Sequence, residues 1–179
     1  MSVNQAVPMS GAHLDWPEAM AAALCDALSG ADEAATFTAL GAATTTLLGP
    51  GLLTINAYAK ASSEVVRLWS SDPQSYPVGG RKSKGDTPWT RQVLHRGEVY
   101  VGEGDAALAE VFDDVATIRG LGLTAVVNVP VCQHGRCVGT FNFLAARHAW
   151  TPVEVTTLRL LAQLAMPAVV AARGGVVEA

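Results

Sequence analysis

The chain has 179 residues, of which 50% are hydrophobic and 16% are charged, which is enough apolar material for the core of one compact domain and excludes an intrinsically disordered chain. The formal net charge is −4 and the densest basic run is Arg81-Lys82-Ser83-Lys84, so the sequence lacks the basic surface that a nucleic-acid backbone requires. Because no apolar stretch is long enough to span a membrane and no signal peptide is readable, we expect a cytoplasmic protein that binds neither nucleic acid nor membrane.

The first part of the chain predicts an arm and two packing helices. Residues 1–14 are small, polar and aperiodic, and we expect them to form a flexible arm ahead of a single domain over residues 15–175. The first helix ends at Ser29-Gly30, and the second begins at Asp32 and ends before Gly49-Pro50-Gly51. Both helices carry apolar residues at helical spacing, which is typical of helices that pack on a core.

The rest of the chain alternates between strands, short helices and one long connection. The predicted elements are strands over 52–58 and 64–70, a connection over 71–84, a helix over 89–95, a strand over 99–101, a helical stretch over 105–119, strands over 124–132 and 136–145, and a last helix that begins with the capping box Thr151-Pro152-Val153-Glu154. This order is not the regular alternation of a doubly wound sheet. It predicts an α+β fold, an α/β sandwich with an antiparallel sheet and the helices from both chain ends on one face.

Side chains in the last two strands alternate between an apolar and a polar set. The fully apolar register is expected to face the helices: Ala125, Val127, Val129 and Val131. We expect Gln133-His134-Gly135 to form a type I turn with Gly135 in the left-handed bulge position, which pairs residue 128 with 140 and places Asn128, Thr140 and Asn142 on one face. A two-residue primed turn would place Asn128 opposite Phe141 and mix the two sets, so the bulged turn is favoured.

The same alternation predicts the floor of a ligand pocket. Arg67 lies in an otherwise apolar strand, where a buried guanidinium needs an anionic ligand, a carboxylate partner or an exposed edge. The candidate floor residues are polar or aromatic: Asn56, Arg67, Trp69, Asn128, Thr140 and Asn142. The candidate roof residues come from the segment that follows: Tyr76, Trp89, Tyr100 and Phe112. Arg81 follows two glycines whose backbone N–H groups are free to approach an anion, and a solvated basic loop is the alternative. Hydrogen bonding within the fold and aromatic core packing are the alternative uses of these residues.

Several segments carry a resemblance to a known family. The run Val129-Pro130-Val131 is followed by Gly135-Arg136-Cys137-Val138-Gly139-Thr140-Phe141-Asn142-Phe143 and by Trp150-Thr151. These segments resemble the last two strands and the terminal helix of the GAF domain family, and the resemblance covers about residues 32–172. Further segments are similar to free-standing bacterial GAF proteins: Tyr76–Lys82, Thr87-Pro88-Trp89, Tyr100-Val101-Gly102 and Val111-Phe112-Asp113.

The resemblance implies both a fold and a function. The fold is a central antiparallel sheet of five to six strands, with a pocket on the face opposite the terminal helices and a roof formed between the strands 64–70 and 124–132. The implied function is that of a sensor in signal transduction that binds a small polar or anionic metabolite. Family members often form homodimers through their terminal helices, and we expect this chain to do the same or to be a purely structural dimerisation module.

An enzymatic alternative depends on the cysteines. One GAF branch, the free methionine-R-sulfoxide reductases, uses a nucleophilic thiolate with resolving cysteines. Cys132 and Cys137 flank the last hairpin, and in the favoured register they point to opposite faces and cannot form a disulfide without backbone movement. The sequence therefore favours a binding domain over an enzyme.

No cofactor or metal is predicted. The four histidines have no spacing typical of zinc ligands, and no Cys-His dipeptide is present for attachment of a bilin. His95, on the predicted roof helix, is a weak candidate for haem ligation.

Overall fold

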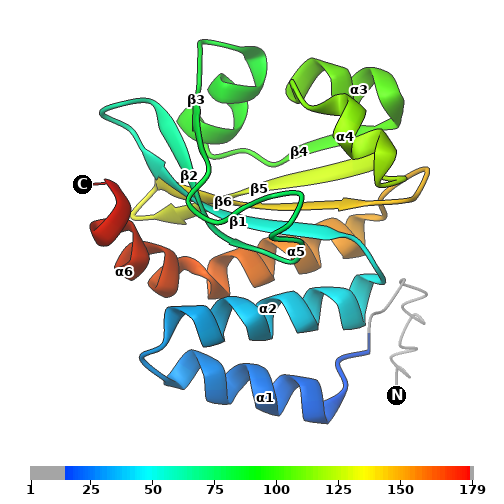
Figure 1. Cartoon of the computed structure of the whole chain (residues 1–179). Helices are drawn as coiled ribbons and strands as arrows, with labels where there is room; N and C mark the ends of the chain where they lie inside the picture. Colours follow the sequence, from blue (N-terminus) through cyan, green and yellow to red (C-terminus); the bar gives the residue numbers. More distant parts are fainter. Residues whose placement is uncertain (1–14, 178–179) are drawn as a thin grey trace, which may run out of the picture.

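The computed structural model describes residues 15–177 and shows a sheet between two layers of helices (Figure 1). The elements are α1 (Glu18–Ser29), α2 (Glu33–Leu48), β1 (Leu52–Ala59), β2 (Glu64–Ser70), β3 (Arg81–Ser83), the π-helix η1 (Thr90–His95), β4 (Tyr100–Glu103), α3 (Gly104–Val111), α4 (Val115–Gly120), β5 (Ala125–Gln133), β6 (Arg136–Ala145), α5 (Pro152–Leu164) and α6 (Met166–Val177). The strand order is β3-β2-β1-β6-β5-β4, and every neighbouring pair is antiparallel. The predicted α+β fold is confirmed. The arm expected over residues 1–14 lies outside the described residues.

Side-chain caps fix the starts of two helices that cover the sheet. The Asp32 carboxylate accepts hydrogen bonds from the backbone N–H groups of Ala34 and Ala35 at the start of α2. Thr151 and Glu154 form the predicted capping box at the start of α5, with Pro152 at the first helical position. These caps satisfy backbone donors that a helix start leaves without partners.

One face of the sheet is covered by α2, α5 and α6, and α1 packs on α2 away from the sheet (Figure 1). The apolar register predicted to face the helices does so, and all of its four residues are buried in the main core: Ala125, Val127, Val129 and Val131. Phe141 and Phe143 of β6 and Leu158 and Leu161 of α5 are members of the same core. Burial of this apolar surface is the main stabilising contribution to the fold.

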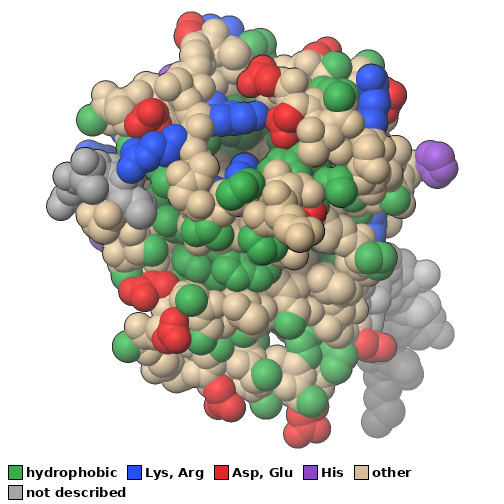
Figure 2. Space-filling model, viewed as in Figure 1, with side chains coloured by type: hydrophobic (Ala, Val, Ile, Leu, Met, Phe, Trp, Pro, Cys, Tyr) green, Lys and Arg blue, Asp and Glu red, His purple; other side chains and the backbone are tan. Residues whose placement is uncertain are grey.

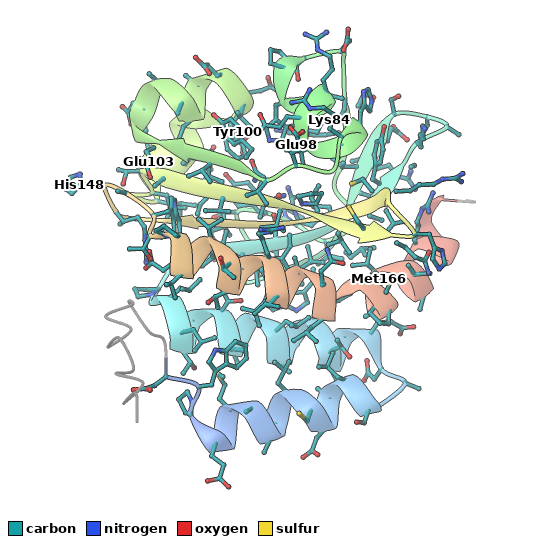
Figure 3. The ribbon with its side chains drawn as sticks, turned by 180° about the vertical axis from the view of Figure 1, so that it is seen from behind. Lys84, Glu98, Tyr100, Glu103, His148 and Met166 are labelled. Carbon is teal, nitrogen blue, oxygen red and sulfur yellow. The ribbon has the colours of Figure 1, made fainter. Side chains whose placement is uncertain are left out.

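The terminal helix is bent where α5 gives way to α6, beside Met166 (Figure 3). Within residues 15–177 no single helix has the length and apolar composition needed to cross a membrane; α5 and α6 reach both only as a pair, and they are bent by 49° from each other.

Two segments between β2 and β5 differ from the prediction. The connection 71–84 contains a short third strand, β3, in which Arg81 pairs with Val66 and Lys82 with Val65. The predicted helix 105–119 is two helices, α3 and α4, separated at Phe112–Asp114. Polar residues make up β3, so it lacks the apolar alternation by which strands are recognised in a sequence.

The hairpin between β5 and β6 has a different turn from the one predicted. His134 and Gly135 both have positive φ, of 49° and 74°, so the turn is the two-residue primed type, and Cys132 pairs with Cys137. Val138 is then left between this pair and the pair Val131–Gly139, as a bulge in β6. The extra residue that restores the alternation therefore lies in the strand and not in the turn. Asn128 pairs with Asn142 and not with residue 140.

A second bulge, in β2, changes the face to which Trp69 points. Asn56 pairs with Arg67, but Ile55 pairs with Trp69, so Leu68 is the extra residue. Arg67 consequently faces the pocket side, whereas Trp69 faces the helices, where its ring lies against Gly41 of α2. The prediction that Arg67 and Trp69 share a face was wrong, because a bulge of one residue reverses the alternation.

Candidate functional site

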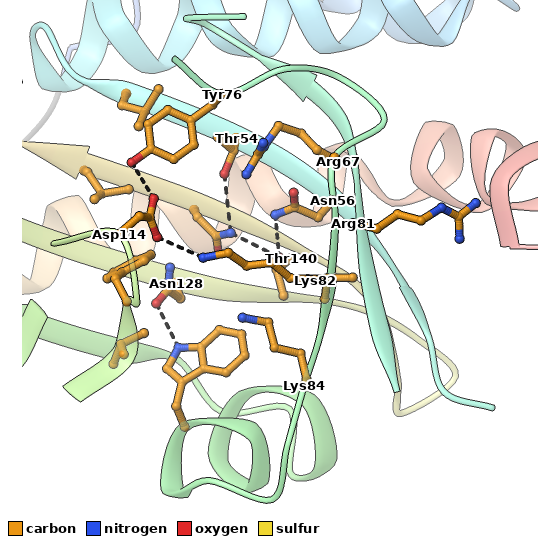
Figure 4. A pocket seen from close by; sticks show the side chains of 18 residues that line it. Thr54, Asn56, Arg67, Tyr76, Arg81, Lys82, Lys84, Asp114, Asn128 and Thr140 are labelled. Atoms are coloured by element: carbon orange, nitrogen blue, oxygen red, sulfur yellow. Dashed lines mark hydrogen bonds and ion pairs between the residues drawn. The ribbon is translucent and has the colours of Figure 1, made fainter. Parts of the chain in front are cut away.

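A cavity of about 160 Å³ lies on the face of the sheet opposite the covering helices, between the sheet and a roof formed by β3, Trp89 before η1 and the connection from α3 to α4 (Figure 4). Figure 2 shows the surface hollowed above the sheet, with basic side chains beside the opening. The volume corresponds to about five molecules of liquid water and is smaller than the roughly 300–1,000 Å³ of sites for drug-sized ligands. The site therefore has room for a small metabolite.

Nine of the eleven predicted site residues line this cavity: Asn56, Arg67, Tyr76, Arg81, Trp89, Phe112, Asn128, Thr140 and Asn142. Nine further residues line it that the prediction did not include: Leu52, Thr54, Val65, Gly80, Lys82, Lys84, Val111, Asp114 and Leu144. The alternation along β1, β5 and β6 brings the floor residues together. The roof comes from the segment between β2 and β5, as the resemblance implied.

Trp69 and Tyr100 do not line the cavity. Trp69 lies on the opposite face of the sheet because of the bulge in β2. Tyr100, on β4 beneath α3 (Figure 3), packs between two smaller apolar clusters, and its hydroxyl donates to the carbonyl of Ala107 at 3.0 Å. Both residues are therefore structural, and the prediction that they form part of the pocket was wrong.

The floor is a cross-strand network of amides and hydroxyls. Asn56 Nδ2 donates to Thr140 Oγ1 at 3.0 Å, and Asn142 Nδ2 donates to Thr140 Oγ1 at 3.2 Å and to Thr54 Oγ1 at 3.4 Å. Asn142 Oδ1 is buried and has no hydrogen-bond partner in residues 15–177. The network is held together across β1 and β6 but leaves an acceptor unused at its surface.

Asn128 presents an unused donor at the floor. Its side chain is 0% exposed, and its Oδ1 accepts a hydrogen bond from Trp89 Nε1 at 2.9 Å. Because the indole N–H can only donate, this bond fixes which end of the amide is oxygen. Asn128 Nδ2 is left with no partner in the described part of the chain. A buried donor without a partner costs about 1–3 kcal/mol, which a ligand acceptor would recover.

Asp114 ties three segments of the roof together. Its carboxylate accepts from Lys82 Nζ at 2.8 Å and from the Tyr76 hydroxyl at 2.9 Å (Figure 4). Burial opposes the charged carboxylate, but the hydrogen bonds from Lys82 and Tyr76 outweigh it and hold the pKa of Asp114 below its ordinary value. Burial, followed by the neighbouring carboxylate, raises the pKa of Tyr76. The tie therefore contains a carboxylate and a neutral phenol at neutral pH.

Two further cations at the cavity have no carboxylate partner among the described residues. Arg67 Nη1 donates to the carbonyl of Pro77 at 3.2 Å and its guanidinium lies 5.0 Å from the centre of the Tyr76 ring, but Nε is buried without a partner. Lys84 Nζ lies 4.8 Å from the centre of the Trp89 ring. Burial lowers the pKa of both groups, and for Lys84 the charge of Lys82 lowers it further. Both charges are held in a partly desolvated site.

Arg81 differs from these two cations. Its guanidinium lies 3.7 Å from the Glu64 carboxylate, and Figure 4 shows the side chain pointing away from the cavity. Arg81 therefore borders the site through its backbone and the base of its side chain.

The cysteines lie outside the cavity lining. Cys132 and Cys137 are direct cross-strand partners, so their side chains share a face; the expectation that they point to opposite faces was wrong because the bulge lies at Val138. Burial, followed by the proximity of Cys132, raises the pKa of the Cys137 thiol to about 12, and burial raises that of Cys132. Raised values disfavour the nucleophilic thiolate. Within residues 15–177, no group of three or more His, Cys, Asp or Glu side chains is placed to hold a metal ion.

The comparisons with known proteins identify the family. The model of the GAF domain family matches residues 18–169. Two similar structures are the GAF domain of a phosphoenolpyruvate-protein phosphotransferase from Coxiella burnetii (TM-score 0.67, 14% identity, 87% of this chain and 93% of that chain) and the GAF domain of a two-component sensor histidine kinase from Bacillus halodurans (0.62, 11%, 78% and 94%). A third similar structure is that of a protein in its far-red absorbing dark state with bound biliverdin IXα (TM-score 0.65, 14% identity, 87% of this chain and 99% of that chain). No curated protein matches the sequence significantly.

The chain is an α+β sandwich with a polar cavity on the open face of its sheet. The chain belongs to the GAF domain family.

Proposed function

We propose that this chain is a cytoplasmic sensor or regulatory domain that binds a small polar or anionic metabolite in the cavity above the sheet. The observation that carries the proposal is Asn128, a fully buried amide that lines the cavity and whose Nδ2 has no partner in the described part of the chain. Binding of a ligand acceptor would satisfy this donor. Structures of the same fold support the proposal, because one holds biliverdin and another comes from a sensor histidine kinase.

The charge of the lining favours an anion. Three basic side chains face the cavity, at positions 67, 82 and 84, against the single carboxylate of Asp114 among the lining residues. Because Asp114 is hydrogen-bonded to Lys82 and Tyr76, it does not oppose the remaining positive charge. The amides and hydroxyls of the floor add neutral hydrogen-bonding groups, which suit a polar ligand body.

The test is a thermal-shift screen against carboxylates, amino acids and purines. A ligand that binds only the folded state raises its stability, by about 2.7 kcal/mol at a concentration 100 times Kd. The site variant is Asn142→Leu, which replaces the amide in the floor with an apolar side chain of the same number and branching of heavy atoms. The control is Thr156→Val, at an exposed position on α5.

Hits that are lost in Asn142→Leu and kept in Thr156→Val are the expected result. A screen without hits, or hits that persist in Asn142→Leu, would contradict a binding function for this cavity.

We also propose that two copies pair through the terminal helices. Leu160 and Leu164, one turn apart on α5, are 56% and 36% exposed and together give this helix an apolar surface for a second copy to cover. Light scattering is expected to give the mass of a dimer at micromolar concentration, and Leu160→Glu to shift it toward the monomer. A wild-type monomer under these conditions would rule this assembly out.

A further inference from the structure

The two lining cations without carboxylate partners lie at opposite ends of the cavity. Arg67 N–H donates to the carbonyl of Gly80, and Lys84 N–H donates to the carbonyl of Ser63, so the two residues flank the paired segment of β2 and β3. Ser63 immediately precedes β2 and is four residues from Arg67, which is about 13 Å along a strand. Lys82 lies between Gly80 and Lys84 in the alternation along β3, and Figure 4 shows its side chain passing between those of Arg67 and Lys84.

One end of the cavity is built around Trp89. Its indole N–H holds the Asn128 amide, and its ring face lies below the Lys84 ammonium. Asn128 Nδ2 and Lys84 Nζ thus belong to two side chains that contact the same indole, and the structure gives neither donor a hydrogen-bond acceptor within residues 15–177. A charged acceptor here would form charge-assisted hydrogen bonds in a partly desolvated site, where they are strong.

The other end is built around Arg67. Its Nη1 is fixed by the Pro77 carbonyl and its guanidinium lies over the Tyr76 ring, which leaves the buried Nε–H without an acceptor in the described residues. Arg67 pairs in register with Asn56, so this end adjoins the amide and hydroxyl network of the floor. An arginine held in one orientation with an unused N–H edge is suited to a carboxylate.

We infer that the ligand is a short-chain dicarboxylate, with one carboxylate on Arg67 Nε and the other on Lys84 Nζ and Asn128 Nδ2. This inference rests on the proposed function and names the class of ligand for the same cavity. A single compact dianion such as inorganic phosphate cannot reach both ends, because Lys82 lies between them and is already bonded to Asp114. The cavity volume of about 160 Å³ limits the ligand to a short chain.

The first arm of the test changes the ligand and leaves the protein intact. Isothermal titration calorimetry of the wild-type chain compares malonate, succinate, glutarate and adipate with the monoamide and the diamide of each, and with inorganic phosphate. Replacing one carboxylate with an amide is expected to weaken binding by about tenfold or more, since the amide oxygen still accepts a hydrogen bond but the negative charge opposite the cation is lost. Phosphate is expected to bind more weakly than the best dicarboxylate.

The second arm removes one end of the site. In Lys84→Met the affinity for the best dicarboxylate is expected to fall by about tenfold, and its preference over the matching monoamide to fall below about threefold. Lys60→Met, at an exposed position in the turn between β1 and β2, makes the same charge change outside the cavity and is expected to leave both values unchanged. Circular dichroism confirms that each variant is folded.

The outcomes separate this inference from the proposed function. Diamides that bind as well as dicarboxylates, phosphate that binds as tightly as any dicarboxylate, or no binding of dicarboxylates at millimolar concentration would each overturn the inference. In those cases the proposed function stands if the library screen yields a ligand whose binding is abolished by Asn142→Leu. It falls together with the inference if the screen yields none.

Discussion

The same strands present different kinds of side chain on the two faces of the sheet. On the helix side the side chains are apolar, buried and packed into one continuous core. On the cavity side the neighbouring residues of the same strands include amides and hydroxyls as well as apolar residues, and the basic residues of β2 and the roof lie above them. Phe141 and Asn142 are adjacent in β6 and belong to different faces. The helix side holds the main core, and the cavity side holds the proposed site beside two smaller apolar clusters.

Unpaired polar atoms concentrate on the cavity side. Five buried side-chain atoms in the described residues have no hydrogen-bond partner, and three of them line the cavity: Arg67 Nε, Asn128 Nδ2 and Asn142 Oδ1. The other two belong to Arg147 and Trp150, whose guanidinium and ring stack at 4.0 Å. Because folded proteins leave few buried polar groups unpaired, this clustering supports the proposal that the cavity binds a ligand.

Truncation of adjacent residues in β6 gives the largest expected contrast between the faces. Phe141→Ala is expected to lower the free energy of unfolding by about 3–5 kcal/mol, since it opens a cavity in the core. Asn142→Ala is expected to cost about 1 kcal/mol, because its side chain borders the cavity and the hydrogen bonds that it loses, to Thr140 and Thr54, are long at 3.2 and 3.4 Å. Urea titration of both variants measures the difference. Equal losses would show that the cavity side is packed as tightly as the helix side.

The position of Trp69 on the helix side is tested at Gly41. A Cβ at Gly41 would collide with the Trp69 ring, so Gly41→Ala is expected to destabilise the fold by about 1–3 kcal/mol despite the better helix propensity of alanine. The control is Gly174→Ala in α6, where a Cβ meets no atom within 4 Å and about 0.5–1 kcal/mol of stabilisation is expected. If both substitutions stabilised the fold, the Trp69 ring would not lie against Gly41, and its position on the helix side would be contradicted.

The fold could be predicted from the sequence wherever one periodicity continued without interruption. The apolar alternation of Ala125–Val131 and the capping box at Thr151 each depend on neighbouring residues only, and both predictions are confirmed. The bulges at Leu68 and Val138 could not be predicted, because a single extra residue leaves no compositional signal and yet reverses every assignment of face beyond it. The floor at Asn128 and Asn142 was still assigned correctly, because the actual turn and the bulge together preserve the alternation.

The roof was the less predictable part of the site. Lys82, Lys84 and Asp114 were not predicted to line the cavity, although Gly80, Lys82 and Lys84 alternate as residues of one strand face do. A strand of three polar residues gives no hydrophobic signal, and the contact between Lys82 and Asp114 joins residues far apart in the sequence. Such long-range pairs follow from the tertiary structure and not from any local pattern.

Substitution of Asp114 is expected to lower the free energy of unfolding by less than the core substitutions do, and by an amount that depends on pH. Asp114→Asn removes charged hydrogen bonds from Lys82 and Tyr76 and is expected to cost about 1 kcal/mol at neutral pH, because the site is partly solvated. Since the pKa of Asp114 is lowered in the folded state, its contribution is present above its ordinary value of 3.8 and is lost as the pH falls below it through the folded-state pKa.

Urea titrations of wild type and Asp114→Asn between neutral and acidic pH measure this effect, and the difference between the two is expected to shrink as the pH falls. Asp105→Asn is the control, since its ion pair with Arg119 is exposed and contributes little. A difference that does not change with pH would mean that the charge of Asp114 is not what holds the roof.

The smallest expected effect on stability is at Lys84. Truncation on the helix side lowers the free energy of unfolding, whereas removal of this charge on the cavity side is expected to leave it unchanged or to raise it. Burial and the charge of Lys82 lower the pKa of Lys84 below its ordinary value of 10.5, so the cavity disfavours the ammonium, although the Trp89 ring returns part of that loss. Lys84→Met is therefore expected to leave stability unchanged or to raise it by up to about 1 kcal/mol at neutral pH.

Between the folded-state pKa of Lys84 and 10.5, the unfolded state binds more protons than the folded state. Wild-type stability therefore rises with pH in this range, and the difference from the Lys84→Met variant closes. A loss of more than about 1 kcal/mol in chemical denaturation would show that Lys84 serves the fold. Unchanged or increased stability together with weaker dicarboxylate binding would show that this side of the sheet keeps a charge for its ligand, in contrast to the apolar core of the helix side.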